Sequence, residues 1–328
     1  NKMRAGRITV STRKFKVVDV PTPSAGAGQV RIKVGAAGVC LSDVHLLEGI
    51  LSPGYLVGDQ VTLGHEVAGT IDQVGAGVST SAIGDRVVLI AGERNHAEQV
   101  TTMGFDYDGG WAEYVVTKAH LVVRIPDSLP FEQAAIIPDA VSTPWAAITS
   151  TAKVRAGEKV AVFGLGGLGI HALQLLKIIG CSVIAIDPRE AARANALARG
   201  ADFAFAPDDP ELKQHRRLHV AFDFAGVATV RKQALSMLGE QGRLIIVGIA
   251  NEPIVIPSDM AFTYMRTQIM GHYGSEDHHV SELIELIASG RLDLSHSISE
   301  IMPLEKAAEA LEKLANKVGN PIRIVLKP

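Results

Sequence analysis

The stretch "VAVFGLGGLG", residues 160–169, decides the fold of much of this chain. It predicts a buried strand that runs through the spacing Gly164-x-Gly166-x-x-Gly169 into a helix. A second predicted strand, "CSVIAID", ends in Asp187, 18 residues after Gly169. The spacing alone is weak evidence, because a glycine-rich turn can be purely structural. With a strand before it, a helix after it and a strand-end acid beyond, it is typical of a dinucleotide-binding site.

Each glycine of this turn has its own role in such a site. Gly164 allows the tight turn, Gly166 lets the backbone approach a pyrophosphate, and Gly169 permits close helix packing. The start of the helix adds N–H donors and a positive dipole. The predicted dinucleotide-binding residues here are Gly164, Gly166, Gly167, Leu168 and Gly169, with Val247 at the end of a later strand.

Asp187 bears on which dinucleotide is bound. A carboxylate at this position can accept both ribose hydroxyls of NAD, and it repels the 2′-phosphate of NADP. Arg189, two residues later, weakens this inference because it can pair with a phosphate, and we include it among the cofactor-binding residues. The alternative interpretation of Asp187 is an ordinary solvated acid at a strand end. On balance the sequence favours NAD.

The regions around this βαβ unit differ in character. Up to about residue 140, short runs rich in Val and Ile, such as "QVRIKV", "VAGTIDQV" and "WAEYVVT", predict a barrel-like all-β domain. After residue 145, strands alternate with helices, which predicts a parallel doubly wound sheet. Two amphipathic helices and a closing strand, "IRIVL", follow. The predicted fold class is therefore α/β with a β-rich partner domain.

Composition limits the function classes. The chain has 328 residues, 47% of them hydrophobic and 20% charged, which fits two well-buried domains. A formal net charge of −3 gives no basic surface for nucleic acid or anionic membranes. No apolar run is long enough to span a bilayer, and "NKMRAGRITV" does not have the pattern of a signal peptide. Two cysteines indicate a reducing compartment, so we expect a cytoplasmic protein.

A second set of residues suggests a metal site. Cys40 lies in the polar segment "GVCLSDVH", "GHEVAG" contains His65 and Glu66, and Asp139 follows near the end of the β-rich region. One thiolate, one imidazole and one carboxylate are suitable zinc ligands that leave a position open for substrate. Taken singly, each residue has a simpler explanation: a buried cysteine, a hydrogen-bonded histidine, or an aspartate that caps a helix.

Four motifs in order, "GVCLSDVH", "GHEVAG", "DGGWAEYV" and "GLGGLG", resemble the zinc-dependent medium-chain alcohol dehydrogenases over almost the whole chain. The resemblance implies a GroES-like catalytic domain over residues 1–140 and a Rossmann domain over 141–273. It also implies a C-terminal return to the catalytic domain over 274–328. Four ordered motifs are far more specific than any one of them.

The resemblance also implies a ligand set. Cys40 and His65 match the first two catalytic zinc ligands. Asp139 matches the third ligand, which is often a cysteine and in some members an aspartate. Glu66 matches an acid that can approach the zinc when water or substrate exchanges, so we include it with both the metal and the catalytic residues.

Further roles follow from matching positions. Ser42 and His45 correspond to the proton relay, and Asp43 to a residue that supports the histidine ligand. Thr143 matches a residue that packs beside the nicotinamide. Arg323, in "IRIVL", matches a basic residue that reaches the cofactor phosphates.

The function implied is that of an NAD-linked alcohol dehydrogenase with one catalytic Zn²⁺ per chain. Zinc would act as a Lewis acid on the substrate oxygen, and hydride would pass between the substrate carbon and the nicotinamide. The substrate implied is a primary or secondary alcohol, or the matching aldehyde or ketone. Ala91 falls near a position that is often aromatic in the family, which favours a medium-sized or bulky secondary or aryl alcohol. The family also implies a homo-oligomer, either a dimer or a tetramer.

One departure from the family is clear. Many members hold a second, structural zinc with four closely spaced cysteines before the "DGGWAEYV" motif. The corresponding interval here, "LIAGERNHAEQVTTMGFDY", has no cysteine, and Ala97 stands where the last thiol would be. We expect His96 and Glu98 to be surface residues and not substitute ligands.

Three alternatives remain open. A polyol or sugar dehydrogenase of the same superfamily would need polar groups in the substrate pocket. A zinc-free quinone or enoyl reductase would lack the set of Cys40, His65 and Asp139. A non-catalytic nucleotide-binding protein is possible because fold does not fix function, although the retained ligand set and relay argue against it.

Overall fold

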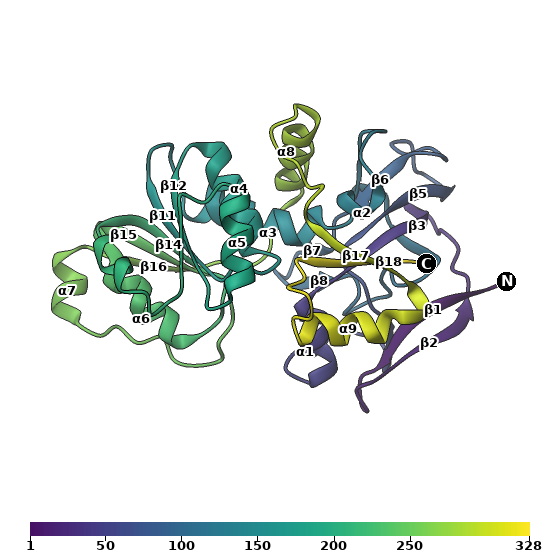
Figure 1. Ribbon diagram of the computed structural model, residues 1–328. Coiled ribbons are helices and arrows are strands. Elements are labelled where there is room, and N and C mark those ends of the chain that lie inside the picture. The colour runs from purple at the N-terminus through teal and green to yellow at the C-terminus, as the bar shows by residue number, and fades with distance from the viewer. The chain divides into compact units, whose positions relative to one another are not determined.

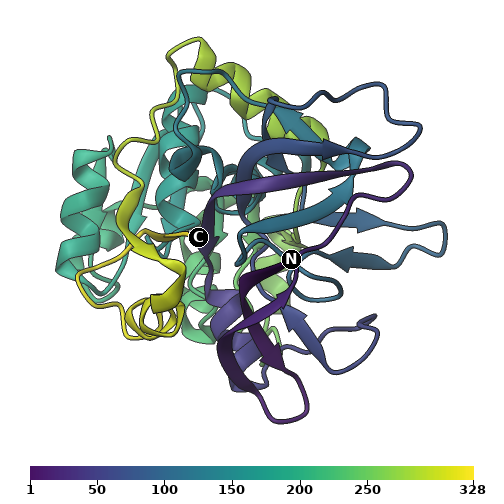
Figure 2. The same ribbon diagram turned by 90° about the vertical axis from the view of Figure 1, so that its right-hand side faces the viewer.

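A computed structural model describes residues 1–328, and the chain forms two compact units (Figures 1 and 2). The first unit combines Asn1–Ala140 with Asp277–Pro328, and the second is Val141–Glu276. The chain therefore leaves the first unit once and later returns to it. None of its helices has the length and apolarity needed to cross a membrane.

The first unit is built around a seven-stranded sheet in which β3 (Gln29–Val39) is central. Its strands follow the order β10-β6-β5-β3-β18-β17, and β9 also pairs with β3. The other strands are β5 (Val67–Val74), β6 (Arg86–Leu89), β9 (Tyr114–Lys118), β10 (Val122–Arg124), β17 (Ile298–Pro303) and β18 (Arg323–Lys327). Partners so far apart in the sequence show that the sheet needs both segments of the unit.

Smaller elements complete this unit. One three-stranded sheet has the order β2-β1-β4, with β1 (Lys2–Thr9), β2 (Lys14–Pro21) and β4 (Gln60–Thr62). Its α-helices are α1 (Leu41–Glu48), α2 (Phe131–Ala134), α8 (Asp277–Ala288) and α9 (Ala307–Ala315). Shorter helical turns are η1 (Ala119–Leu121), η5 (Leu304–Lys306) and the π-helical turn η2 (Ile137–Val141), which ends just past the boundary. Apolar side chains from β3, β5, β6 and α9 share one buried core.

The interval that lacks the structural-zinc cysteines folds as a hairpin of β7 (Gly92–Arg94) and β8 (Val100–Thr102). Asn95 closes it, because its Oδ1 accepts the N–H groups of Ala97 at 2.9 Å and Gln99 at 3.0 Å. His96 and Glu98 are exposed, as expected. Side-chain hydrogen bonds therefore hold this turn.

The second unit contains a six-stranded sheet in which every neighbouring pair is parallel. The order is β13-β12-β11-β14-β15-β16, so the chain reverses direction across the sheet between β11 and β14. The strands are β11 (Lys159–Phe163), β12 (Ser182–Ile186), β13 (Phe203–Phe205), β14 (Leu218–Asp223), β15 (Leu238–Ile246) and β16 (Gln268–Gly271). The predicted doubly wound sheet is confirmed.

The helices of this unit alternate with the strands, as Figure 1 shows. They are α3 (Ser142–Ala146), η3 (Ala147–Thr151), α4 (Gly169–Ile179), α5 (Glu190–Ala198), η4 (Pro210–Gln214), α6 (Ala228–Met237) and α7 (Asp259–Tyr264). The glycine-rich turn leads into α4, as predicted. This helix stops at Gly180, which takes the left-handed conformation (φ 104°) and returns its N–H to Leu176.

Candidate active site

Cys40 lies at the point where β3 ends and α1 begins. The carboxylate of Asp43, in the first turn of α1, accepts the Cys40 N–H at 2.9 Å. The same buried carboxylate lies 3.5 Å from Nδ1 of His65. One aspartate thus bonds to the backbone of Cys40 at the start of the helix and places its second oxygen beside the ring of His65.

Sheet pairing brings the remaining residues to this point. Val39, next to Cys40, pairs with Ile324 of β18, and Ala37 pairs with Val67 of β5. The residues just before these partners, Arg323 on β18 and Glu66 ahead of β5, are therefore held close to Cys40. Asp139 comes from η2, and π-helical turns are frequently found at functional sites.

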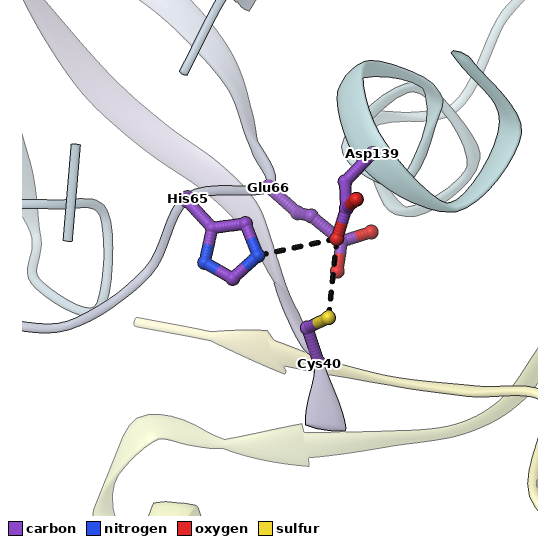
Figure 3. A group of neighbouring side chains, drawn as sticks. All are labelled: Cys40, His65, Glu66 and Asp139. Carbon is purple, nitrogen blue, oxygen red and sulfur yellow. Dashed lines mark hydrogen bonds and ion pairs between the residues drawn. The ribbon is translucent and has the colours of Figure 1, made fainter. Parts of the chain in front are cut away.

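The donor atoms converge, as Figure 3 shows. Oδ2 of Asp139 lies 3.1 Å from Sγ of Cys40 and 3.2 Å from Nε2 of His65. A ligand atom of Glu66 joins them, and all four lie within 4.8 Å of one another. All four residues are in the first unit.

This donor set fits zinc. Zinc bonds of about 2.0–2.3 Å place tetrahedral ligands roughly 3.3–3.7 Å apart, close to the two separations found here. The imidazole has a carboxylate behind it, which is the usual second partner of a zinc-bound histidine. The structure thus brings together the predicted ligands Cys40, His65 and Asp139, with Glu66 beside them.

Arg323 balances the negative charge of this cluster. Arg323 is 3% exposed, and its Nε donates to Oε1 of Glu66 at 3.2 Å. A terminal nitrogen of the same guanidinium lies 3.0 Å from Oε2 of Glu66, which completes an ion pair. It also lies 3.3 Å from Oδ2 of Asp139. We expected Arg323 at the cofactor phosphates, yet its partners in the structure are two carboxylates of the metal site. Sequence reasoning missed this role, because it depends on the pairing of β18 with β3.

Burial and charge set the ionisation of these groups. Burial raises the pKa of the Cys40 thiol, and the Asp139 carboxylate raises it further. Burial also raises the pKa of Glu66 to about 7, although Arg323 opposes the shift. Burial disfavours charge on Asp139 too, but hydrogen bonding and charge from His65, together with Arg323, hold its pKa well below the usual range. A divalent cation here would favour the thiolate.

The predicted relay residues lie on α1. Ser42 Oγ is 3.4 Å from Nε2 of His65, so this hydroxyl is beside the ligand cluster. His45 follows in the last turn of the same helix. No hydrogen bond joins the side chains of Ser42 and His45 in the structure.

The glycine-rich turn of the second unit fits a dinucleotide. A Cβ on Gly169 would lie 1.7 Å from the Gly164 carbonyl oxygen, so the helix packs where only glycine is tolerated. A Cβ on Gly166 would meet nothing within 4 Å, which leaves its backbone open to a ligand. The buried His171, a residue the sequence interpretation overlooked, donates from Nδ1 to the Gly167 carbonyl at 2.6 Å.

Asp187 is held tightly at the end of β12. It accepts the N–H of Leu165, in the glycine-rich turn, at 2.9 Å. Arg189 donates its own N–H at 2.9 Å and its Nε at 3.1 Å to the same carboxylate. Burial would raise the pKa of Asp187, but the hydrogen bonds from Arg189 lower it below the usual value. In the structure the side chain of Arg189 is therefore paired with the Asp187 carboxylate.

The other predicted cofactor residues also lie in the second unit. Thr143 is buried on α3. Val247 follows β15, and its N–H donates to the Asp223 carbonyl at 3.0 Å.

These two sites define a class of protein. A partly buried thiol and carboxylate beside a buried imidazole can hold a catalytic metal, and a glycine-rich turn can bind a dinucleotide. This combination is that of a metal-dependent, dinucleotide-dependent oxidoreductase.

Comparisons with known proteins define the family. Residues 26–127 match the alcohol dehydrogenase GroES-like domain, and residues 167–289 match the zinc-binding dehydrogenase domain. An alcohol dehydrogenase of Geobacillus stearothermophilus is 30% identical, over 99% of each chain. An NAD-dependent alcohol dehydrogenase of Sulfurisphaera tokodaii is 28% identical, over 96% of this chain and 97% of that one.

Solved structures agree. A cobalt- and zinc-bound thermostable alcohol dehydrogenase from Pyrobaculum aerophilum superposes with a TM-score of 0.87 at 27% identity, over 100% of both chains. The chain belongs to the zinc-dependent medium-chain alcohol dehydrogenase family. The predicted family, fold class, enzyme class and cofactors, zinc and NAD, are confirmed. Alcohol dehydrogenases that use two cysteines and one histidine are a known example of a three-ligand zinc site. In this chain Asp139 is the third residue beside Cys40 and His65.

Proposed function

We propose that this chain oxidises an alcohol reversibly to an aldehyde or ketone, with Cys40, His65 and Asp139 as the ligands of one catalytic zinc. The observation that carries the proposal is the convergence of these three donors on Oδ2 of Asp139, at 3.1 and 3.2 Å. When bound, zinc supplies Lewis acidity at the substrate oxygen and NAD accepts the hydride.

The surrounding side chains manage protons and charge. Ser42 Oγ, beside His65, is the group that accepts the proton of the alcohol, and His45, in the last turn of the same helix, is the second relay residue. Asp43 holds His65 in its ligating orientation. Glu66 and Arg323 form a buried pair that keeps the charge near the ligands balanced.

The substrate is a bulky secondary or aryl alcohol, or its carbonyl counterpart. The support for this choice is the short side chain of Ala91, near a position that is often aromatic in the family. Trp111 is 0% exposed and donates its indole N–H to the Gly38 carbonyl at 3.1 Å. We therefore assign Trp111 to the core.

The chain acts as a homo-oligomer, a dimer or a tetramer, through α7 and the edge strand β16. Residues 251–261 are all exposed, and Met260 and Tyr264 of α7 are 66% and 78% exposed. Large apolar side chains gathered in this way are typical of a covered interface. We place the protein in the cytoplasm, which the two free cysteines support.

The test combines metal analysis with NAD reduction over a panel of primary, secondary, aryl and polyhydroxylated alcohols. We expect one zinc per chain, and turnover that is highest with secondary or aryl alcohols. The variant Asp139→Ala should lose both zinc and activity, whereas Glu98→Ala, in the hairpin, should keep both. Full zinc content and activity in Asp139→Ala would refute the ligand assignment, and a preference for polyols would identify a sugar-type enzyme.

A further inference from the structure

Three loops meet at the carboxyl edge of the parallel sheet in the second unit. They follow β11, β14 and β15, and backbone bonds join them: Phe224 N–H donates to the Phe163 carbonyl at 2.9 Å, and Gly248 N–H to the Asp223 carbonyl at 2.8 Å. The contact is too close for side chains, since a Cβ on Gly248 would lie 2.4 Å from the Gly226 nitrogen. Ligands of doubly wound sheets bind at this edge, near the reversal of strand order.

A buried ion pair fastens the loops after β14 and β15. Asp223 is 0% exposed, and its Oδ1 accepts the N–H groups of Ala225 and Gly226 at 2.9 and 3.0 Å. Its Oδ2 accepts Nε of Arg231, on α6, at 3.0 Å. The second arm of that guanidinium donates to the Gly248 carbonyl at 3.0 Å. Arg231 thus bonds to the Asp223 carboxylate at the end of β14 and to the Gly248 carbonyl in the loop after β15.

These loops belong to a particular half of the sheet. The turn at Gly164–Gly169 and the acid Asp187 are in the half formed by β11, β12 and β13, which takes the adenylate part of a dinucleotide. The loops joined by Arg231 are in the half formed by β14, β15 and β16. This fold consists of two mononucleotide-binding halves, so the half formed by β14, β15 and β16 binds the second mononucleotide, which carries the nicotinamide.

We infer that Arg231 is a positioning residue for the nicotinamide half of the bound dinucleotide, because it fixes the loop after β15 to the loop after β14. This inference rests on the proposed function. Arg231 acts through Asp223 and the Gly248 carbonyl and not by touching the cofactor. An arginine suits the task because its planar fork can donate to two groups at once, which a lysine cannot reproduce.

Removing the arginine alone would leave Asp223 buried without its countercharge, which destabilises any protein and would obscure the result. The double variant Asp223→Asn/Arg231→Met avoids this, because the amide oxygen can still accept the two N–H groups while the link to Gly248 is lost. Arg231→Lys is a second variant, which keeps the charge and loses the fork.

A matched control lies at the opposite edge of the same sheet. Arg243 on β15 pairs with Glu158 at 3.0 Å and donates to the Ala152 carbonyl at 2.8 Å. It therefore joins a carboxylate and a carbonyl as Arg231 does, but at the amino ends of the strands. The control variant is Glu158→Gln/Arg243→Met.

The measurements are the Kd of NADH by fluorescence, the Kd of AMP by calorimetry, and the Tm. In both Arg231 variants we expect NADH to bind roughly ten-fold more weakly, the loss of about one hydrogen bond to a charged group, with AMP binding within two-fold of the wild type. The control should bind both ligands normally. Unchanged NADH binding, or NADH and AMP weakened equally, would overturn the inference. A wild-type chain that binds AMP but not NADH would contradict the proposed function itself, and that failure would be visible before any variant is made.

Discussion

Arg323 supplies a positive charge beside the carboxylates of the candidate metal site. Thiol, imidazole and two carboxylates lie within 4.8 Å of one another, and the guanidinium contacts both carboxylates. Buried charges persist when they are paired and hydrogen-bonded. With zinc bound by Cys40, His65 and Asp139, two anionic ligands would neutralise the metal, and Arg323 would neutralise Glu66.

Asp187 should decide the choice of cofactor. Replacing it with Ser removes the repulsion of a 2′-phosphate and releases Arg189, which now donates to Asp187 at 3.1 Å. We expect the ratio of kcat/KM for NAD over NADP to fall roughly a hundred-fold, since two charge-assisted hydrogen bonds are lost. Steady-state kinetics with both cofactors measure this ratio. Equal efficiency with NAD and NADP in the unmutated enzyme would contradict the assignment.

The same carboxylate should make stability depend on acid pH. Its pKa is lowered in the folded chain, from about 3.9 when unfolded, so its contribution is present above about pH 4. That contribution is lost as the pH falls through the folded pKa, because protonation then breaks the bonds with Arg189. Denaturant unfolding between pH 7 and pH 3 should show a smaller loss of stability in Asp187→Asn than in the wild type. Parallel curves would disprove the link.

Ser42 is expected to affect chemistry and not cofactor binding. Ser42→Ala removes the proton acceptor beside His65 but leaves the second unit untouched. Alcohol turnover should fall by about 10²–10⁴-fold, the usual range for general acid–base groups. The Kd for NADH should stay within two-fold of normal. Normal turnover across the pH range would exclude Ser42 from the relay.

At the scale of elements, the β7–β8 hairpin shows how the segment without the structural-zinc cysteines is held together. Asn95 makes the local bonds that hold this turn, so no second metal is needed there. The three proposed zinc ligands come from the junction of β3 and α1, from η2 and from the loop before β5, so a metal bound by them would close no separate lobe.

A chelator should therefore remove one zinc per chain and abolish activity without unfolding the protein. The cluster can remain folded because His65 and Arg323 pair with the acids. Metal analysis, circular dichroism and NADH binding before and after treatment provide the test, and added zinc should restore activity. Two tightly bound zincs, or unfolding on chelation, would count against this account.

At the scale of the whole molecule, α7 is the least covered helix. Its first residues follow the Ser258 cap, and none of its side chains is buried. If subunits meet there, Tyr264→Glu should give monomers in sedimentation, because it places a charge in an apolar contact. Ile83→Glu, at an exposed apolar residue of the first unit, is the control and should leave assembly unchanged. An unaltered mass for Tyr264→Glu would move the interface elsewhere.

Much of this organisation could be predicted from the sequence, because its signals are local. The turn at Gly164–Gly169 and the strand ending at Asp187 lie within one short segment, and apolar periodicity marks the elements around them. The partners of Arg323 could not be predicted this way. Its bond to Glu66 spans 257 residues and depends on β3 pairing with both β5 and β18. The bond from Arg231 to the Gly248 carbonyl could not be predicted either, because it depends on the pairing of β14 with β15.

The late pairing of β18 with β3 has a consequence for biosynthesis. A ribosome delivers Cys40, His65 and Asp139 early, but Arg323 emerges only after the whole second unit has been made. At usual translation rates this interval lasts on the order of tens of seconds, during which Glu66 lacks the guanidinium that pairs with it. Until β18 is made, β3 lacks one of its neighbours, and the sheet of the first unit is incomplete. We expect the first unit to depend most on chaperones, and to be most prone to binding the wrong metal, during this interval.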